Sequence, residues 1–402
     1  MLMNNADYND CYYTAMRQVM KISRKKLDDL YQMGVYKSHR DFADKALIIN
    51  NANGSGSREA MLFGAEFGKR SDDISRQCDS YLDRAVREGI FTISREDPDY
   101  PYNWTCVRGM PDVVFAKGVR SVFSRCDKCG CVSVVGSREA SKYALYAAKV
   151  FSDSLSAKNV VIASGLAAGV DRAAHEASVD NQGGTVAFLA GGVDDIYPYT
   201  NRDIYEKICQ RGLVVSEMPP GTRALRQYFP SRNRLIAGIG DVCLIMQAGA
   251  TSGTLHTASF AAGQGKDVFV LPNNIFSEEC KGGNLLLADG AVPLINSSMV
   301  EDAVITALMN RKMKDVNMAG LSPKTRVSID EIRRKAKESP ELMSDNEWKN
   351  LILDELSLKG RAVDEICSLF GLSLSEVTRF MIALESDSKV TVRDGKYVLT
   401  IV

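Results

Sequence analysis

Short apolar runs recur along the middle of the chain, and segments long enough for a helix separate them. Runs of this kind are typical of buried strands in a mostly parallel sheet with helices on both faces. The sequence therefore predicts an α/β fold with an extended, Rossmann-like, doubly wound and mostly parallel sheet. The predicted strands are Val132 to Val135, Val160 to Ala163, Thr185 to Leu189, Leu213 to Val215, Val242 to Met246 and Val268 to Leu271.

A turn of small or polar residues follows each predicted strand. In an open α/β sheet such turns emerge at the carboxyl edge, where ligands bind at the switch in strand order. After the first strand, Gly136 allows close approach of the backbone, and Ser137 and Arg138 offer anion contacts. We therefore expect a phosphate site at this turn, with a tight structural turn that carries a surface Arg as the alternative. Only one of the three glycines of the dinucleotide fingerprint is present.

The segment between Glu217 and Asp241 contains no acidic residue, yet it places arginines around an aromatic pair. Guanidinium groups bind phosphate oxygens as rigid forks, and an aromatic face stacks on any base, so the segment suits a single nucleic-acid strand. The alternative is an ordinary basic loop that closes on neighbouring carboxylates. The residues are Arg223, Arg226, Arg232 and Arg234 around Tyr228 and Phe229.

Several motifs then follow one another in a set order. They are Val135-Gly136-Ser137-Arg138 with Ser141 and Tyr143, Ser164-Gly165-Leu166-Ala167 with Asp171 and His175, Tyr197-Pro198, Ser216-Glu217, Phe229-Pro230-Ser231-Arg232-Asn233-Arg234, and Ser252-Gly253-Thr254. Over about residues 90 to 295 this order closely resembles the DNA-processing protein A family, DprA, also called Smf. The chain departs from the family pattern at Asn273 and at His256.

The resemblance implies a bacterial protein that binds single-stranded DNA, dimerises, protects incoming strands during natural transformation or DNA processing, and loads the RecA recombinase. It implies no enzymatic activity, and we expect no catalytic residue, cofactor or metal. The DNA ligands that it implies are Gly136, Ser137 and Arg138, then Ser164 and Gly165 on the adjacent turn, and Arg226, Phe229, Arg232 and Asn233 in the basic aromatic segment.

A nucleotide-binding hydrolase or sensor is the alternative function. Doubly wound folds of this kind resemble those of cytokinin-activating phosphoribohydrolases, whose Gly-Gly-x-Gly-Thr-x-x-Glu turn supplies a carboxylate. Here Thr257 stands where that acid would be. A general base could instead be His175, which follows Asp171 at helical spacing, but no nucleophile with an orienting partner accompanies it. A packing or capping role for His175 is therefore favoured.

A cysteine cluster precedes the first predicted strand. Cys126, Cys129 and Cys131, with Cys106, could offer thiolates to a metal, but a tetrahedral zinc site usually needs two well-spaced pairs. Free thiols are the expectation, with Cys131 beginning the strand.

Composition limits how the chain can bind nucleic acid. The formal net charge is zero, so binding must depend on local patches. No leader pattern opens the chain, no apolar run of about 18 residues occurs, and the cysteines follow no disulfide framework. We expect a cytoplasmic protein that does not enter a membrane.

The sequence predicts four parts, which are a helical N-terminal domain over 1–90, the Rossmann-like core over 91–300, a basic linker over 301–345 and a winged-helix domain over 346–402. The last part is predicted to hold three helices and a hairpin, over Trp348 to Leu356, Val363 to Phe370, Ser373 to Leu384 and Val390 to Leu399, with the hairpin turn at Asp394-Gly395. Arg379 is the only base on the expected recognition helix, and acidic residues outnumber basic ones. Protein contact is therefore favoured over duplex binding.

Overall fold

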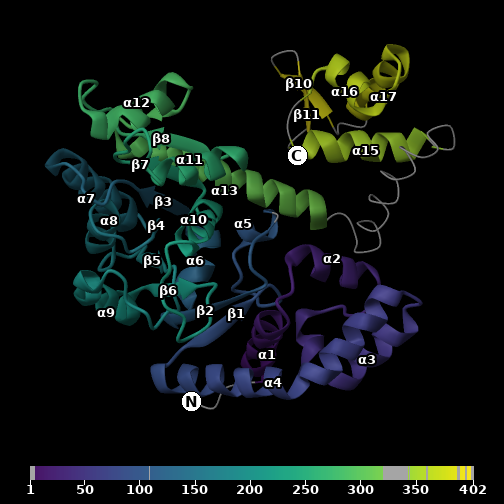
Figure 1. Ribbon diagram of the computed structural model, residues 1–402. Coiled ribbons are helices and arrows are strands. Elements are labelled where there is room, and N and C mark those ends of the chain that lie inside the picture. The colour runs from purple at the N-terminus through teal and green to yellow at the C-terminus, as the bar shows by residue number, and fades with distance from the viewer. Residues whose placement is uncertain are drawn as a thin grey trace. The chain divides into compact units, whose positions relative to one another are not determined.

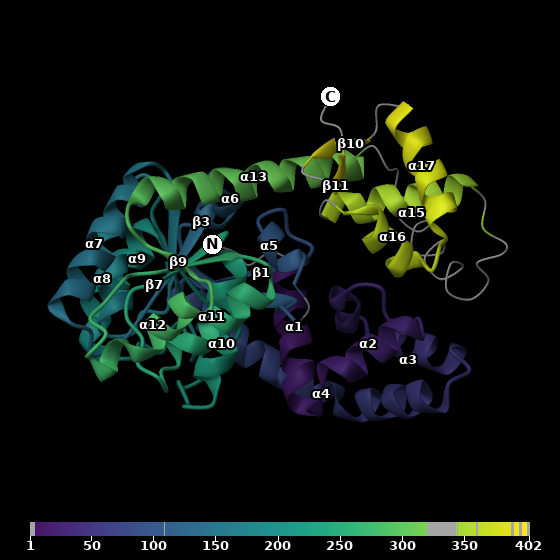
Figure 2. The ribbon, with the colours of Figure 1, turned by 90° about the horizontal axis from the view of Figure 1, so that it is seen from above.

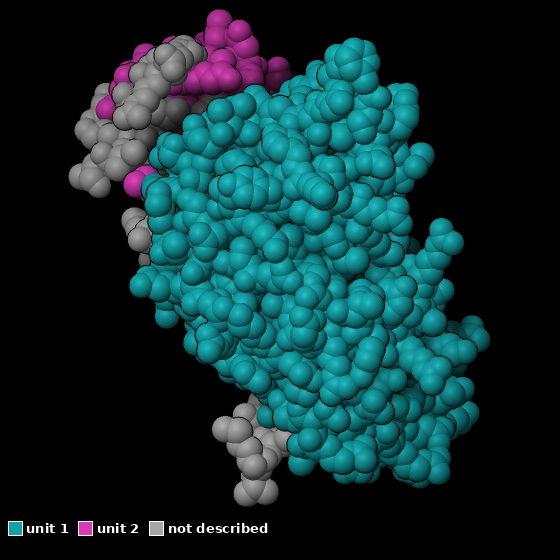
Figure 3. Space-filling model, turned by 90° about the vertical axis from the view of Figure 1, so that its left-hand side faces the viewer, with its two compact units in different colours: residues 1–308 teal, residues 309–402 magenta. Residues whose placement is uncertain are grey.

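The structure is a computed structural model that describes residues 5–107, 109–319, 343, 345–358, 361–386, 390–393 and 396–399. The chain divides into two compact units, residues 1–308 (unit 1) and residues 309–402 (unit 2), which Figure 3 shows in different colours. Each unit contains its own cluster of buried apolar side chains.

Unit 1 is built around a nine-stranded sheet with the order β1-β2-β6-β5-β4-β3-β7-β8-β9 (Figure 1). Strand β2 is antiparallel to β1 and β6, and all other neighbours are parallel. The fold is therefore a mixed, mostly parallel α/β sheet. The strands are β1 Phe91–Ser94, β2 Val113–Gly118, β3 Cys131–Val135, β4 Val161–Ser164, β5 Thr185–Phe188, β6 Leu213–Ser216, β7 Val242–Ile245, β8 Asp267–Val270 and β9 Val292–Pro293.

The six strands predicted from the sequence, β3 to β8, are confirmed within one residue at each end. The prediction missed β1, β2 and β9. Strand β3 is where the order reverses, since β4, β5 and β6 follow on one side and β7, β8 and β9 on the other. This reversal is the topological switch at which open α/β sheets bind ligands.

Helices cover both faces of the sheet (Figure 2). Successive side chains of a strand point to opposite faces, so Val132 and Val134 pack under α7 and α8, whereas Val135 packs with α10 and α11. The helical segments that follow β1 in unit 1 are α5 Tyr102–Thr105, α6 Ser121–Cys129, α7 Lys142–Ala157, α8 Val170–Ser178, η2 Tyr199–Asn201, α9 Arg202–Arg211, α10 Tyr228–Ile239, α11 Thr254–Gly263, η3 Glu278–Cys280, α12 Lys281–Ala288 and α13 Ser297–Ala319.

Five helical segments precede the sheet in unit 1. They are α1 Asn5–Met20, α2 Arg24–Gln32, η1 His39–Ala43, α3 Lys45–Gly54 and α4 Arg58–Glu88. The longest, α4, begins after Ser57, whose hydroxyl caps the Ala60 N–H, and ends at Gly89 in the left-handed conformation (φ 66°).

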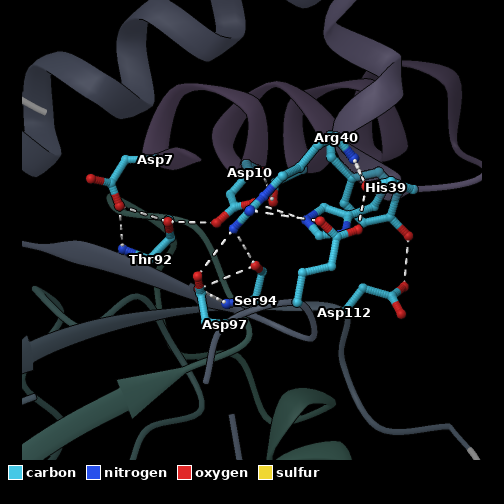
Figure 4. A network of polar contacts seen from close by, with 12 residues as sticks. Asp7, Asp10, His39, Arg40, Thr92, Ser94, Asp97 and Asp112 are labelled. Atoms are coloured by element: carbon cyan, nitrogen blue, oxygen red, sulfur yellow. Dashed lines mark hydrogen bonds and ion pairs between the residues drawn. The ribbon is translucent and has the colours of Figure 1, made fainter. Parts of the chain in front are cut away.

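A polar network joins these helices to the first strand (Figure 4). Asp7 accepts hydrogen bonds from the N–H and the hydroxyl of Thr92, at 3.1 and 2.8 Å. Buried Asp10 lies 2.8 Å from the His39 ring nitrogen and 3.2 Å from Arg40, and Arg40 also donates to Ser94 and Asp97 of the sheet side. The helical segments and the sheet thus belong to one unit, and a separate domain that ends at residue 90 stays a prediction.

After α13, the described residues of unit 2 form three helices and one antiparallel strand pair, at the positions that the sequence predicts. Its core includes Trp348, Ile352, Ile366 and Phe380. The predicted hairpin turn at Asp394-Gly395 lies outside the described residues. Helix α13 occupies the first part of the predicted basic linker, and most of the remainder is also outside them. The elements are α15 Asp345–Leu358, α16 Val363–Phe370, α17 Leu374–Ser386, β10 Val390–Arg393 and β11 Lys396–Leu399.

Within the described residues, no single helix has the length and apolar composition needed to cross a membrane. One pair, Val363–Phe370 with Leu374–Glu385, meets that requirement jointly but bends by 118° at the break between its helices.

Candidate functional site

A crevice opens at the carboxyl edge of the sheet, where the strand order reverses. It has a volume of about 380 Å³, within the range of about 300–1,000 Å³ that ligand pockets occupy. A smaller hollow of about 130 Å³ adjoins it and shares Arg138, Ala167, Phe229 and Arg232 with it. Turns that follow β3, β4 and β7 and the first turn of α10 contribute to the crevice, whose lining includes Gly136, Ser137, Arg138, Phe229, Asn233 and Ser252. The predicted gathering of turns at this edge is confirmed.

The turn after β3 has little room for side chains at its first position. A Cβ on Gly136 would lie 2.5 Å from Val170 at the start of α8, so only glycine fits without a shift. The Ser137 carbonyl accepts the Val170 N–H at 3.2 Å, and its hydroxyl accepts the Glu139 N–H. Arg138 is exposed at the crest of the turn. The turn therefore presents the Arg138 guanidinium to the crevice.

Three side chains surround the Phe229 ring, which is half-buried. The guanidinium carbon of Arg138 lies 5.1 Å from the ring centroid, and that of Arg232 lies 5.7 Å from it. Tyr197, 51% exposed, meets the ring edge-on with centroids 5.7 Å apart. Residues from three separate motifs thus form one cation–π and aromatic cluster. Tyr197 was absent from the predicted site, although its Tyr-Pro motif after the third predicted strand was a usable signal.

Arg232 lies beneath this cluster. Its side chain is among the buried ones, at 6% exposure, and its Nη1 donates to the carbonyls of Gly165 and Phe188, which end β4 and β5. A Cβ on Gly165 would lie 2.5 Å from the same nitrogen. Burial lowers the pKa of the Arg232 guanidinium to about 10, with nearby Asp171 opposing the shift. Arg232 therefore links the turn after β4 to the end of β5 from inside the protein.

Ser164 and Gly165, also predicted to bind DNA, use their polar groups inside the protein. The Ser164 hydroxyl is fully buried and donates to the Val134 carbonyl at 2.6 Å. The Gly165 N–H donates to Asp171 at 3.1 Å. Direct contact of these two residues and Arg232 with DNA stays a prediction, but their polar groups have internal partners.

His175 is a packing residue in this structure, as favoured from the sequence. Its Nε2 accepts the Leu166 N–H at 3.3 Å, and its Nδ1 lies 2.7 Å from the Thr185 hydroxyl. Because that hydroxyl donates to the Ile162 carbonyl, Nδ1 carries the proton and the ring is neutral. Burial lowers the pKa of His175 to about 3, and Arg232 adds to the shift. We name Ser164, Gly165, Asp171, His175 and Arg232 the buried frame of the site.

The loop between β6 and α10 carries exposed arginines. Arg223 and Arg226 are exposed, whereas Arg234 pairs with Glu217 and so fits the ordinary-loop alternative. Asn233 is half-buried and accepts a hydrogen bond from Arg232 Nε at 3.2 Å. We name Arg138, Tyr197, Arg226 and Phe229 the contact layer of the site.

Two carboxylates of the β5–η2 connection hold this loop. Asp194 accepts the Gly221 N–H at 3.0 Å and pairs with Arg84 of α4, and Asp195 accepts the Ala224 N–H at 2.7 Å. Hydrogen bonds at Gly221 and Ala224 therefore hold the loop that carries the exposed arginines.

The carboxyl end of α10 is held by side chains from other elements. Its last carbonyls would otherwise lack partners, as at any helix end. Burial lowers the pKa of Lys266, one of these donors, to about 8. Each donor is a side chain and each acceptor is a backbone carbonyl of α10. Trp104 donates to Leu235, Ser133 to Ile236, Lys266 to Ala237 and Gly238, and Asn103 to Ile239. Helix α10 is thus fixed at one end and presents Phe229 at the other.

Thr257, which replaces the acid of the hydrolase turn, is buried at 1% exposure on the wall of the crevice. Two cysteines near β3 have different hydrogen-bond partners. The Cys126 thiol donates to the Val122 carbonyl, whereas the Cys129 sulfur accepts from the Asn159 amide. In the part of the chain that the structure describes, no three His, Cys, Asp or Glu side chains are grouped so that they could hold a metal.

Comparison with known proteins gives consistent matches over the sheet. The family described as DNA recombination-mediator protein A matches residues 91–304. The Bacillus subtilis DNA processing protein DprA is 35% identical over 208 residues, which cover 52% of this chain and 69% of that protein. Streptococcus pneumoniae DprA is 30% identical over 274 residues, covering 68% and 93%. The X-ray structure of DprA from Streptococcus pneumoniae superposes with a TM-score of 0.55 at 28% identity, over 70% of this chain and 98% of that one.

Proposed function

This chain belongs to the DNA recombination-mediator protein A family, and from that premise we propose that it binds single-stranded DNA, protects it and loads the RecA recombinase onto it during natural transformation or DNA processing. The observation that carries the DNA-binding part is the cluster of Arg138, Phe229 and Tyr197 at the switch in strand order. The Arg138 guanidinium could bind a phosphate, and the Phe229 ring beside it could stack on a base.

Such a cluster favours a single strand over a duplex. Phosphate contacts supply affinity without sequence information, and a base can stack on an aromatic ring only when it is unpaired. The crevice has the size of about one nucleotide-sized ligand. We propose that the contact layer touches the strand, and that Gly136 and Ser137 shape the phosphate turn while Asn233 adds a polar contact at the rim.

The buried frame has a different part in this proposal. Ser164, Gly165 and Arg232 act by holding the turns of β4 and β5 in position, since their polar groups bond inside the protein. Loss of a frame residue should therefore disturb folding and binding together.

We also propose that the protein is not an enzyme. Release of a base from a nucleotide needs a carboxylate for acid or base work, and Thr257 occupies the position where the related hydrolases keep one. The proposal includes a cytoplasmic location, where RecA and the DNA would meet.

A homodimer is part of the same proposal. Apolar side chains are exposed at the β8–β9 end of the sheet, where β9 is an edge strand, and patches of this kind often mark interfaces. They belong to Ile275, Phe276, Leu285 and Ile295.

We propose that the sheet of unit 1 is an extended Rossmann-like fold. We also propose that unit 2 is a winged-helix domain that contacts another protein. Arg379 of α17, the only base on the expected recognition helix, pairs with Asp345 at 3.0 Å. A helix that lacks clustered basic side chains is poorly suited to bind the groove of duplex DNA.

The test is a binding titration of the purified chain with single-stranded and duplex oligonucleotides across salt concentrations. We expect tighter binding to the single strand, little dependence on sequence, and a fall in affinity with salt of about 0.7 in slope for each phosphate contacted. Equal or tighter duplex binding, or insensitivity to salt, would contradict the proposal. Sustained release of base from nucleoside monophosphates would contradict the non-enzyme part.

A further inference from the structure

A second pair of an aromatic ring and a guanidinium lies beside the first, outside the predicted site. The guanidinium carbon of Arg202 is 5.6 Å from the centroid of the Tyr199 ring, and its Nη1 donates to the Tyr199 hydroxyl at 2.5 Å. The ring is 66% exposed. The pair repeats the construction of Phe229 with Arg138, at 5.1 Å.

The turn that carries Tyr199 is anchored to the site. Asn201 is buried at 2% exposure and donates to the Leu166 carbonyl at 2.9 Å, next to Gly165 of the buried frame. Arg172 of α8 donates to the Thr200 carbonyl at 3.0 Å. The Tyr199 ring therefore projects from a fixed backbone, and stacking on it would not require ordering of a loop.

The two pairs are neighbours along the carboxyl edge. Tyr197 already touches Phe229, and Tyr199 is two residues further, so the two tyrosine Cα atoms are at most about 7.6 Å apart. In the sheet, β3, β4 and β5 stand next to one another in that order. A strand that leaves the crevice at β3 reaches the η2 turn after β5 without leaving the edge.

The local charge indicates which part of a nucleotide this surface would take. Arg202 pairs with Glu206 at 2.7 Å, and Arg172 pairs with Asp203 and Glu176. The cations near η2 are thus balanced by carboxylates, which would repel a phosphate. An exposed, rigid aromatic face without net charge suits an unpaired base.

We propose that Tyr199 and Arg202 form a second base-stacking position, which takes an unpaired nucleobase of the strand that leaves the Phe229 position. This inference rests on the proposed function, because it extends the same strand along the carboxyl edge. It adds stacking and almost no phosphate contact.

The experiment measures the affinity of Tyr199→Ala for oligothymidylates of increasing length. Short oligonucleotides that fill only the Phe229 position should bind the variant as they bind the parent. Beyond the length that reaches η2, the affinity of the variant should fall about 5- to 150-fold below the parent, with the same salt slope. Tyr199→Phe keeps the ring and should restore most of the loss.

Tyr31→Ala serves as the matched control, since Tyr31 is a half-exposed tyrosine of α2 away from the sheet edge. It should bind every length as the parent does. If Tyr199→Ala matches the parent at all lengths while Phe229→Ala binds weakly, the second position is refuted and the proposed function stands. If the parent itself binds single-stranded oligonucleotides no more tightly than duplex, the proposed function fails, and this inference fails with it.

Discussion

The buried frame and the contact layer both contain arginine, but they differ in where its polar groups are satisfied. Phe229 and Arg232 are one helical turn apart on α10 and both line the crevice, yet Phe229 is half-buried whereas Arg232 is only 6% exposed. Arg138 and Arg232 both lie over the Phe229 ring, one from the solvent side and the other from the sheet side. We therefore expect an arginine in such a motif to contact DNA where it is exposed and to hold neighbouring turns where it is buried.

Arg232→Met should show the largest effect, and mainly on stability. The change leaves the Gly165 and Phe188 carbonyls without their donor, and it removes the guanidinium whose charge opposes the rise in the pKa of Asp171. Each buried acceptor left without its donor costs about 1–3 kcal/mol. Thermal melting should report a large drop, with Arg226→Met, an exposed arginine, as the control that melts like the parent. If Arg232→Met melts normally but binds DNA with a smaller salt slope, Arg232 belongs to the contact layer instead.

His175 of the buried frame should also make the free energy of unfolding depend on pH. The pKa of His175 is about 3 in the folded protein and about 6.5 in an unfolded chain, so only the unfolded chain takes up the proton between these values. Stability is therefore lost as pH falls below about 6.5, by about 2–3 kcal/mol at pH 4.5. Burial raises the pKa of Asp171, which acts in the opposite direction, so the parent must be compared with His175→Gln.

The measurement is the free energy of unfolding of both proteins at several pH values between 4.5 and 7.5. The difference between parent and His175→Gln should shrink as pH falls. A difference that stays constant over this range would mean that His175 titrates normally and does not belong to the buried frame.

Phe229→Ala tests the contact layer and should act on affinity. Loss of a stacking ring costs about 1–3 kcal/mol of binding, and the salt slope should hardly change because no charge is removed. Because the ring is only half-buried, the melting temperature should fall far less than for Arg232→Met. A stable variant with undiminished single-strand affinity would exclude Phe229 from the contact layer. A severe loss of stability would show that it is a core anchor.

Arg138→Ala should give the smallest change, and it should be equal for all sequences. If the exposed guanidinium makes one phosphate contact, as proposed, its loss should flatten the dependence of affinity on salt by about 0.7, the share of one phosphate in a single strand. The matched control is Arg87→Ala, which removes the same charge from an exposed position of α4. A salt slope that is unchanged in Arg138→Ala would indicate that its role is only to cover the Phe229 ring.

Local patterns were sufficient to predict the six strands from β3 to β8, the turns at their carboxyl ends and the elements of unit 2, because each depends on neighbours in the chain. Strand β9 was missed because it has only two residues and lies at the sheet edge. Strands β1 and β2, which pair antiparallel, come before the series of parallel strands on which the prediction rests. The depth of Arg232 depends on carbonyls of Gly165 and Phe188, tens of residues away in sequence. No local pattern contains that information, so the contact layer and the buried frame could not be separated before the structure.

The antiparallel edge of the sheet has a consequence for how the chain is made. Strand β2 has β1 as one neighbour, but its other neighbour is β6, which leaves the ribosome about one hundred residues later. At about 5–20 residues per second, β2 waits roughly 5–20 s with one side open. An open strand edge can pair with another chain, so nascent copies translated close together are expected to aggregate unless a chaperone covers them. The interval is set by the number of residues between β2 and β6, so a shorter connection between these strands would shorten it.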